Sequence, residues 1–276
     1  MTTLITGATG HIGRLLVDEL LARGVRLRAL SRNPDTAHLP PAVEVVDGSL
    51  GDVPDEIFTG IDAVFLFPAA DDIDGFVARA IAAGATRFVV LSSLAVSERN
   101  SRDAGSSTQV HHRAVEDAVT SRTDEWTILR PGNFANNLLY WAYPIRSGYP
   151  VRVPYPESSQ VLIHEADIAS AAAAALTEPD HEGRIYELTG PRSLTKIEQL
   201  AAISAAIGRE ATLTEVSPDE FRADMGQYMS PSIIDMLLGY WSETVEEPEQ
   251  PLEPVLGVKR RTLEQWAVDH RGDFSG

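Results

Sequence analysis

Short apolar runs alternate along the first half of the chain with segments whose apolar residues recur every three to four positions. The runs predict buried strands, and the segments with the longer period predict amphipathic helices. The predicted strands are residues 3–6, 26–31, 43–47, 63–67, 88–92 and 126–130, and the predicted helices are residues 11–23, 73–83 and 109–121. Alternation of this kind is typical of βαβ units, so we expect an α/β fold with a doubly wound parallel sheet of six strands.

A glycine-rich turn joins the first predicted strand to the first predicted helix, with the spacing G-x-x-G-x-x-G. Such a turn presents free backbone N–H groups and the positive end of the helix dipole to a pyrophosphate. Gly7 allows the tight turn, Gly10 the close approach of the backbone, and Gly13 the packing of helix on strand. We interpret this as a Rossmann dinucleotide-binding turn rather than a glycine turn without a ligand. The cofactor contacts predicted for it are Gly7, Thr9, Gly10, His11, Ile12 and Gly13.

The end of the second predicted strand indicates which dinucleotide is bound. Proteins that bind NAD(H) place an Asp or Glu there, on the ribose hydroxyls. This chain instead has Ser31, Arg32 and Asn33. Because a guanidinium pairs with a 2′-phosphate through two parallel hydrogen bonds, Arg32 favours NADP(H) over NAD(H). A solvated surface arginine is the alternative.

Further cofactor contacts are expected where the other strands end, since ligands of doubly wound sheets bind at the carboxyl ends of the strands. We expect the segment after the third strand to border the adenine, the segment after the fourth to follow the cofactor, and those after the fifth and sixth to lie near the nicotinamide. These segments contribute Asp47, Gly48, Ser49, Leu50, Pro68, Ala69, Ser92, Pro131, Asn133 and Phe134.

The pattern becomes less regular and richer in aromatic residues after Pro131. We predict a nucleotide-binding core over residues 1–133 and a smaller C-terminal substrate-binding lobe over 134–276, with about 161–190 returning to the core. Regular patterns return further along the chain: they predict helices at 165–176, 195–207 and 262–269, and an apolar run lies at 185–188. Five glutamates and three prolines in residues 242–254 predict an exposed connector.

Composition narrows the classes of partner. A net charge of −17 argues against a general nucleic-acid-binding surface, since Lys and Arg hold phosphate backbones. The sequence contains neither a long apolar stretch nor a signal peptide, so we expect no membrane partner and a cytoplasmic location. It contains no cysteine and no set of His and carboxylate residues at metal-ligand spacing, so we expect no metal site. A homo-oligomer is compatible with the sequence.

Several motifs together resemble the NmrA-like branch of the atypical short-chain dehydrogenases/reductases. They are TGATGHIG at 6–13, SRN at 31–33, DGSLGD at 47–52, LSS at 91–93, His112-x-x-x-Glu116, WTILRPGNF at 126–134 and HEADIA at 164–169. The resemblance covers residues 2–210. It implies a Rossmann domain, a preference for NADP(H), and a C-terminal lobe that closes over a small substrate. The family includes both reductases and redox sensors without enzymatic activity.

The resemblance also shows a departure from the superfamily's usual catalytic residues, a Ser or Thr followed by a Tyr and by a Lys four residues later. The family spacing puts His112 in the place of the lysine and Thr108 in the place of the tyrosine. A threonine hydroxyl does not titrate in the useful range. His112 could hold the ribose or donate a proton, with Glu116 orienting it or pairing elsewhere, and Ser92 could hydrogen-bond the substrate. Alternative acids from the lobe are Tyr140, Tyr143, Tyr155 and Tyr228.

Two functions remain open at this point. The first is an NADPH-dependent oxidoreductase that reduces a small carbonyl, imine or enone-like substrate by hydride transfer, with His112 and Ser92 as its catalytic candidates. The second is a non-catalytic redox sensor that binds NADP(H) and regulates a protein partner. The missing Tyr and Lys are compatible with both.

Overall fold

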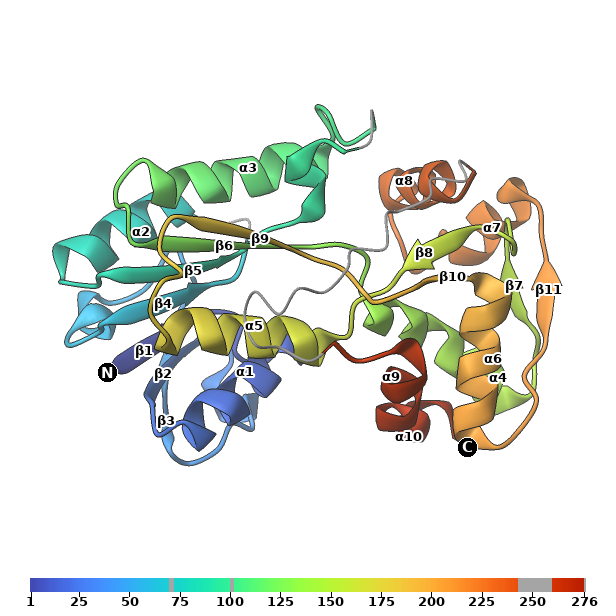
Figure 1. Ribbon diagram of the computed structural model, residues 1–276, viewed down its shortest axis with the longest axis horizontal. Helices are drawn as coiled ribbons and strands as arrows, with labels where there is room; N and C mark the ends of the chain where they lie inside the picture. The colour runs from blue at the N-terminus through green and yellow to red at the C-terminus, as the bar shows by residue number, and fades with distance from the viewer. Residues whose placement is uncertain (70–71, 100–101, 243–259, 276) are drawn as a thin grey trace. The chain divides into compact units, whose positions relative to one another are not determined.

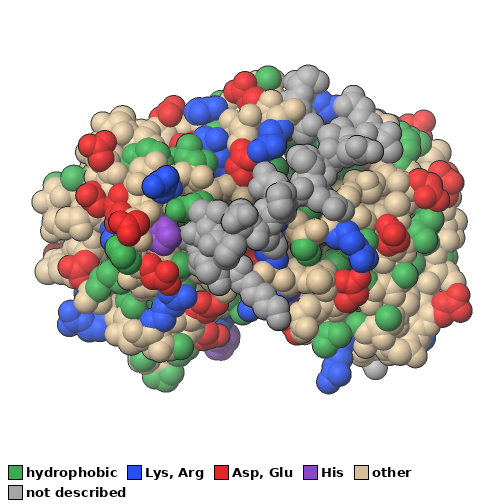
Figure 2. All heavy atoms as spheres, viewed as in Figure 1, with side chains coloured by type: hydrophobic (Ala, Val, Ile, Leu, Met, Phe, Trp, Pro, Cys, Tyr) green, Lys and Arg blue, Asp and Glu red, His purple; other side chains and the backbone are tan. Residues whose placement is uncertain are grey.

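The computed structural model describes residues 1–69, 72–99, 102–242 and 260–275 of the chain. Its described residues form two compact units. The first contains residues 1–132 and Glu165–Leu188, and the second contains residues 133–164, 189–242 and 260–275. Among the described helices, none is long and apolar enough to cross a bilayer. In Figure 2, acidic and basic side chains are interspersed over the described part of the face shown.

The first unit is built on a parallel sheet with the strand order β3-β2-β1-β4-β5-β6-β9. The strands are β1 (Thr2–Ile5), β2 (Arg26–Ser31), β3 (Val43–Asp47), β4 (Ala63–Leu66), β5 (Arg87–Leu91), β6 (Trp126–Pro131) and β9 (Arg184–Leu188). Residues of the central strands, such as Val64 and Phe65, are fully buried, as expected for a sheet covered on both faces. The predicted α/β Rossmann fold is confirmed.

The prediction of six strands is wrong by one, because the run at 185–188 joins the sheet as β9. It pairs with β6 from Thr127 opposite Arg184 to Pro131 opposite Leu188. Its residues are exposed or only partly buried, with Ile185 45% exposed. A strand at a sheet edge lacks the continuous apolar run that marks a central strand, so its membership depends on pairing rather than on its own pattern.

Helices cover both faces of this sheet (Figure 1). One face carries α1 (His11–Ala22) and α5 (Glu165–Thr177), and the other carries α2 (Ile73–Ala82) and α3 (Ser107–Thr120). Side chains cap the second pair, because Asp72 accepts a hydrogen bond from Gly75 N and Ser106 accepts one from Gln109 N. The first unit also contains the 3₁₀ turns η1 (Pro34–Thr36), η2 (Asp55–Phe58) and η3 (Leu94–Ser97).

The second unit combines short helices with two small sheets, one pairing β8 with β10 and the other pairing β7 with β11. Its strands are β7 (Val151–Val153), β8 (Ser159–Val161), β10 (Ser193–Thr195) and β11 (Leu213–Glu215). Its helices are η4 (Ala135–Trp141), α4 (Ala142–Ser147), α6 (Lys196–Ile207), α7 (Pro218–Met225), α8 (Pro231–Ser242), α9 (Leu263–Asp269) and α10 (Arg271–Phe274). One apolar cluster contains Trp141 and Trp266, and another contains Phe221 and Trp241. Apart from Ser242, the connector predicted at 242–254 lies outside the described residues.

Candidate functional site

A cavity of about 470 Å³ opens at the carboxyl ends of β1 to β4 in the first unit. It is lined by residues from the glycine turn and from the segments that follow the strands: Thr6, Gly7, Thr9, Leu30, Ser31, Arg32, Asn33, Thr36, Ala37, Gly48, Ser49, Leu50, Phe67 and Ala69. Nine of these were predicted as cofactor contacts, whereas Thr6, Leu30, Thr36, Ala37 and Phe67 were not. The position and lining agree with a nucleotide site at the edge of a doubly wound sheet.

The glycine turn has no room for a side chain at Gly7 or Gly13. Gly7 has a φ of +68°, and a Cβ there would lie 2.8 Å from Cβ of Phe67. A Cβ on Gly13 would lie 2.1 Å from the carbonyl oxygen of Gly7. Gly10 is the N-cap of α1 and supplies no side-chain cap, so N–H groups of the first turn remain for an anion.

Phe67 is held over this turn by the hydroxyl of Thr6. That hydroxyl donates to the carbonyl oxygen of Phe65 at 3.2 Å and accepts from the backbone N–H of Phe67 at 2.7 Å. Thr6 precedes Gly7 in the sequence, and its polar side chain at the end of an apolar strand was the signal for this role. Phe67 is 40% exposed and forms an apolar wall of the cavity.

Arg32 is exposed and lines the cavity, and within the described residues it has neither a hydrogen bond nor an ion pair. Arg28, within β2, is instead bound to Glu44 at 2.8 Å. Near Arg32, the Ser31 hydroxyl accepts a hydrogen bond from the backbone N–H of Asn33 at 3.2 Å. The Ser31 carbonyl oxygen accepts one from the backbone N–H of Gly48 at 3.1 Å. The guanidinium of Arg32 therefore stands at the cavity with its donors open to an anion.

The other predicted cofactor contacts are not part of the cavity lining. Gly10 and His11 are exposed at the start of α1, and Asp47 is exposed at the end of β3. Ile12 and Gly13 are buried beneath the turn. Pro68 precedes Ala69 after β4, and its carbonyl oxygen lies 3.2 Å from Nε2 of His111. Pro131 ends β6, whereas Asn133 and Phe134 begin the second unit.

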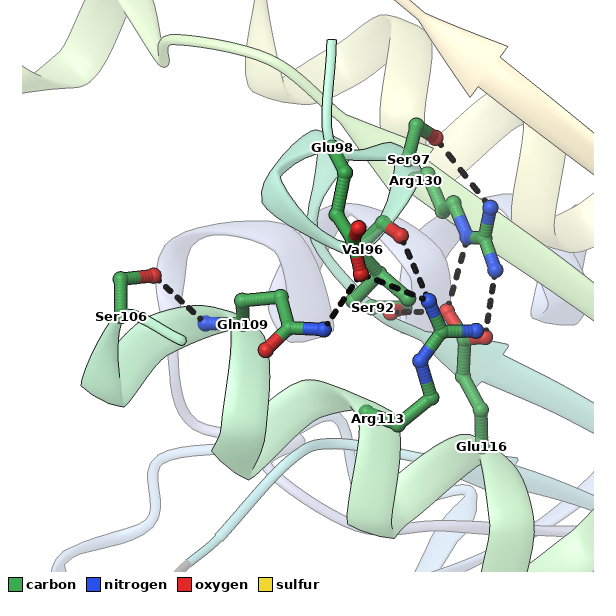
Figure 3. Close-up of polar contacts among 9 residues, drawn as sticks. All are labelled: Ser92, Val96, Ser97, Glu98, Ser106, Gln109, Arg113, Glu116 and Arg130. Carbon is green, nitrogen blue, oxygen red and sulfur yellow. Dashed lines mark hydrogen bonds and ion pairs between the residues drawn. The ribbon is translucent and has the colours of Figure 1, made fainter. Parts of the chain in front are cut away.

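A buried polar network connects α3 with the ends of β5 and β6 (Figure 3). Glu116 on α3 accepts Nε of Arg130 at 2.9 Å and Nη2 of Arg130 at 2.7 Å. Its Oε1 also accepts the hydroxyl of Ser92 at 2.5 Å. Burial and a low local dielectric strengthen these bonds, and they make an unpaired member costly. Ser92 is thus a donor to Glu116 in this structure, and Glu116 pairs with Arg130 rather than orienting the ring of His112.

A second set of contacts attaches α3 to the segment after β5. Arg113 donates to the carbonyl oxygen of Val96 at 2.9 Å, and Gln109 donates to the carboxylate of Glu98 at 2.9 Å. Arg130 also donates to the hydroxyl of Ser97 at 3.2 Å. Figure 3 shows these bonds on the side of α3 that faces η3. The helix that carries His112 is therefore fixed at several points.

His112 lies on α3 one turn before Glu116, and its environment differs from that of a surface histidine. Its Nδ1 is buried and has no hydrogen-bond partner among the described residues. Burial, and then the neighbouring His111, lower its pKa from 6.5 to about 4, against a smaller opposite effect of Glu116. The imidazole is therefore neutral at pH 7. It can donate one hydrogen bond and accept another, but it is not charged in advance as an acid.

The four tyrosines considered as replacement acids lie in different surroundings. Tyr140 is buried, which raises its pKa. Tyr143 and Tyr228 are 67% and 73% exposed. Tyr155 has a left-handed backbone, with a φ of +50°. Burial disfavours the tyrosinate form of Tyr140, so it donates a hydrogen bond more readily than it donates its proton.

A family model described as NAD(P)H-binding matches residues 7–179, which contain the α3 network and the cavity lining apart from Thr6. The chain belongs to this NAD(P)H-binding family. Family membership confirms, at this level, the resemblance predicted from the motifs.

Relatives and solved structures are similar over nearly the whole chain. A (4-alkanoyl-5-oxo-2,5-dihydrofuran-3-yl)methyl phosphate reductase from Streptomyces griseus is 33% identical over 99% of both chains. An NAD(P)H azoreductase from Xenophilus azovorans is 29% identical over 98% of both chains. The crystal structure of an NADPH-dependent quinone oxidoreductase from Escherichia coli, complexed with NADPH, has a TM-score of 0.78 and 22% identity, covering 97% of this chain and 99% of that one. At this identity, the structure supports the fold alone.

The buried state of His112 predicts a pH dependence of stability for this NAD(P)H-binding protein. Its folded-state pKa of about 4 lies below its unfolded value of 6.5, so below pH 6.5 the unfolded chain binds a proton that the folded chain does not. This lowers stability as pH falls from 6.5 toward 4. We expect the wild type to lose about 2 kcal/mol relative to His112→Asn between pH 7.5 and pH 5. Urea unfolding at the two pH values measures the difference. An equal change in the free energy of unfolding of both proteins between the two pH values would contradict it.

Proposed function

We propose that the protein is an NADPH-dependent oxidoreductase that transfers hydride to a conjugated, electron-poor acceptor of the enone type. The observation that carries this proposal is the combination of a dinucleotide cavity with weak proton donors at the end of β5 and on α3. Ser92 gives its hydroxyl proton to a hydrogen bond with Glu116, and His112 is neutral at pH 7. Simple ketones need proton donation as hydride arrives, and this set of residues is poorly suited to that.

The two curated relatives support an acceptor of this class. The name of the Streptomyces griseus reductase describes a ring C=C bond next to a ring carbonyl and an alkanoyl group. The name of the Xenophilus azovorans enzyme describes an azo group. Both groups accept hydride at one atom and spread the resulting charge over others. For this chain we accordingly prefer an enone-like acceptor to an isolated carbonyl.

The residues of the first unit would hold the dinucleotide as follows. The glycine turn and the first turn of α1 would bind the pyrophosphate, and Arg32 with Asn33 would bind the 2′-phosphate. Bound NADPH supplies the hydride. His112 would hydrogen-bond the ribose or the reduced substrate through its neutral ring, and Ser92 would act through Glu116 as a positioning residue. After hydride transfer, water or the N–H group of His112 would protonate the reduced substrate in a slower, separate step.

The substrate-binding lobe, here the second unit, is part of the same proposal. The alternative is a redox sensor that binds NADP(H) without turnover. NADPH oxidation at 340 nm distinguishes the two, with a butenolide, a quinone, an azo dye and a saturated ketone as the acceptors. We expect oxidation with at least one conjugated acceptor and none with the saturated ketone. Tight NADPH binding without oxidation by any acceptor would favour the sensor, and turnover of the saturated ketone alone would contradict the acceptor class.

The proposed preference for NADP(H) predicts a selective effect at Arg32. Replacing Arg32→Ala removes charge-assisted hydrogen bonds to the 2′-phosphate, so NADPH affinity should fall by about 10- to 100-fold while NADH affinity stays the same. Calorimetric titration of both nucleotides measures this. Arg26→Ala, at the opposite end of β2, is the matched control and should change neither affinity. An unchanged ratio of the two affinities in Arg32→Ala would refute the proposed role.

A further inference from the structure

Arg14, in the first turn of α1, connects two walls of the dinucleotide cavity. Its Nε donates to the carbonyl oxygen of Thr9 in the glycine turn at 3.0 Å. Its Nη2 donates to the carbonyl oxygen of Ala37 at 2.7 Å, and its Nη1 donates to that of His38 at 3.0 Å. Thr9 and Ala37 line the cavity from opposite segments. One side chain therefore spans the glycine turn and the segment that follows β2.

The guanidinium of Arg14 is committed to backbone carbonyl groups rather than to a carboxylate. Asp18 lies one helical turn further along α1 and borders the same hollow of about 360 Å³ as Arg14 and His38. Within the described part of the chain, Arg14 nevertheless forms no ion pair with it. Three carbonyl oxygens on two segments match the fixed, planar arrangement of guanidinium donors. A lysine ammonium, which is a single point, could not reach both segments in the same way.

The segment that Arg14 holds needs support. It forms the 3₁₀ turn η1, closed by a bond from Ala37 N–H to the carbonyl oxygen of Pro34 at 3.1 Å. His38, directly after it, has a φ of +48°, a left-handed conformation that costs energy in a residue other than glycine. The same segment carries Arg32, Asn33 and Thr36 into the cavity lining. Loss of the bonds from Arg14 would let this wall move away from the glycine turn.

We propose that Arg14 is a positioning residue that determines cofactor specificity. By fixing residues 32–38 against the glycine turn, it holds Arg32 at the distance from the pyrophosphate site that a 2′-phosphate requires. This inference rests on the proposed binding of NADP(H) at the cavity. It does not depend on the acceptor or on turnover, because Arg14 acts on binding alone. NADH, which lacks the 2′-phosphate, depends less on the position of this wall.

The test measures nucleotide affinities of the full chain by calorimetry. Wild type, Arg14→Lys and Arg14→Met are titrated with NADPH, NADH and adenosine 2′,5′-bisphosphate. We expect NADPH and the bisphosphate to bind about 10-fold more weakly or worse in both variants, and NADH to change by less than about threefold. Arg14→Lys keeps the positive charge. Weaker NADPH binding in this variant would therefore assign the effect to the geometry of the guanidinium. Arg23→Met is the matched control, since Arg23 lies directly after α1 and pairs with Glu19 and Glu178.

Each other outcome overturns a definite statement. An NADPH affinity in Arg14→Lys equal to that of the wild type would mean that the charge alone acts. Equal losses of NADPH and NADH affinity would mean that Arg14 has a general structural role. Either result overturns the inference. If Arg14→Met does not fold, the inference is tested with Arg14→Lys alone, by its nucleotide affinities and its amide hydrogen exchange. Exchange in residues 34–38 should be faster in Arg14→Lys than in wild type, and unchanged exchange overturns the inference. A wild type that does not prefer NADPH over NADH instead refutes the proposed cofactor, before any variant is considered.

Discussion

Replacing Gly13→Ala should weaken binding of NADPH and NADH by similar factors of about 10 to 100. The added Cβ would lie 2.1 Å from the carbonyl oxygen of Gly7 and 2.7 Å from Cα of Ala8. Both are backbone atoms of the turn, so the turn itself must move, and overpacking of this kind typically costs about 1–3 kcal/mol. The turn would bind the pyrophosphate that both nucleotides share. Calorimetric titration with each nucleotide measures the effect.

The control for Gly13→Ala is Gly272→Ala in α10, where an added Cβ would meet nothing within 4 Å. It should change neither affinity. The pattern also separates the turn from Arg32, since the Arg32 variant is expected to affect NADPH alone. Wild-type binding of both nucleotides by Gly13→Ala would contradict the assignment of the glycine turn to the pyrophosphate.

Replacing Glu116→Ala should lower the free energy of unfolding by about 3–5 kcal/mol. Removing Glu116 leaves the Arg130 guanidinium buried without its carboxylate, and breaking a buried ion pair typically costs this much. The hydroxyl of Ser92 loses its acceptor as well. Urea unfolding at pH 7 gives the difference directly. The loss exceeds what an exposed ion pair contributes, which is about 1 kcal/mol or less.

Two further variants make this prediction sharper. The double variant Glu116→Leu with Arg130→Met fills the site with apolar side chains, so it should recover much of the stability lost in Glu116→Ala. Glu98→Gln alters a more exposed carboxylate that contacts the same helix through Arg113, and should cost less than about 1 kcal/mol. A Glu116→Ala variant no less stable than Glu98→Gln would show that the buried pair does not hold α3 in place.

The central strands could be predicted from the sequence because burial on both faces leaves a continuous apolar run. All six predicted strands begin within one residue of the observed start. The run at 185–188 was predicted, but its place as a seventh strand was not, because Ile185 and its neighbours are partly exposed and only the register with β6 places it in the sheet. Local pattern determines a strand, and long-range pairing determines the sheet to which it belongs.

The site residues likewise divide into those that local sequence predicts and those that depend on contacts between distant segments. The glycine turn and Arg32 were predictable, because their chemistry follows from residue type and from position after a strand. The pairing of Glu116 with Arg130 joins a helix to a strand, and no spacing reveals it. Thr36 and Ala37 reach the cavity through the shape of a 3₁₀ turn, which apolar patterning does not record. The neutral state of His112 follows from its burial in the folded chain.

The most direct test of the proposed function is transfer of deuterium to an acceptor from NADPH that carries deuterium at both C4 positions of the nicotinamide. The acceptor is a butenolide, whose reduced product keeps the transferred deuterium on carbon, and mass spectrometry of that product reports the isotope. We expect the butenolide product to carry one deuterium at the carbon of the former double bond farther from the ring carbonyl, with the second hydrogen taken from solvent. NADPH bound tightly by the protein, with no deuterium incorporated into the butenolide, would contradict hydride transfer and leave nucleotide-dependent regulation as the function.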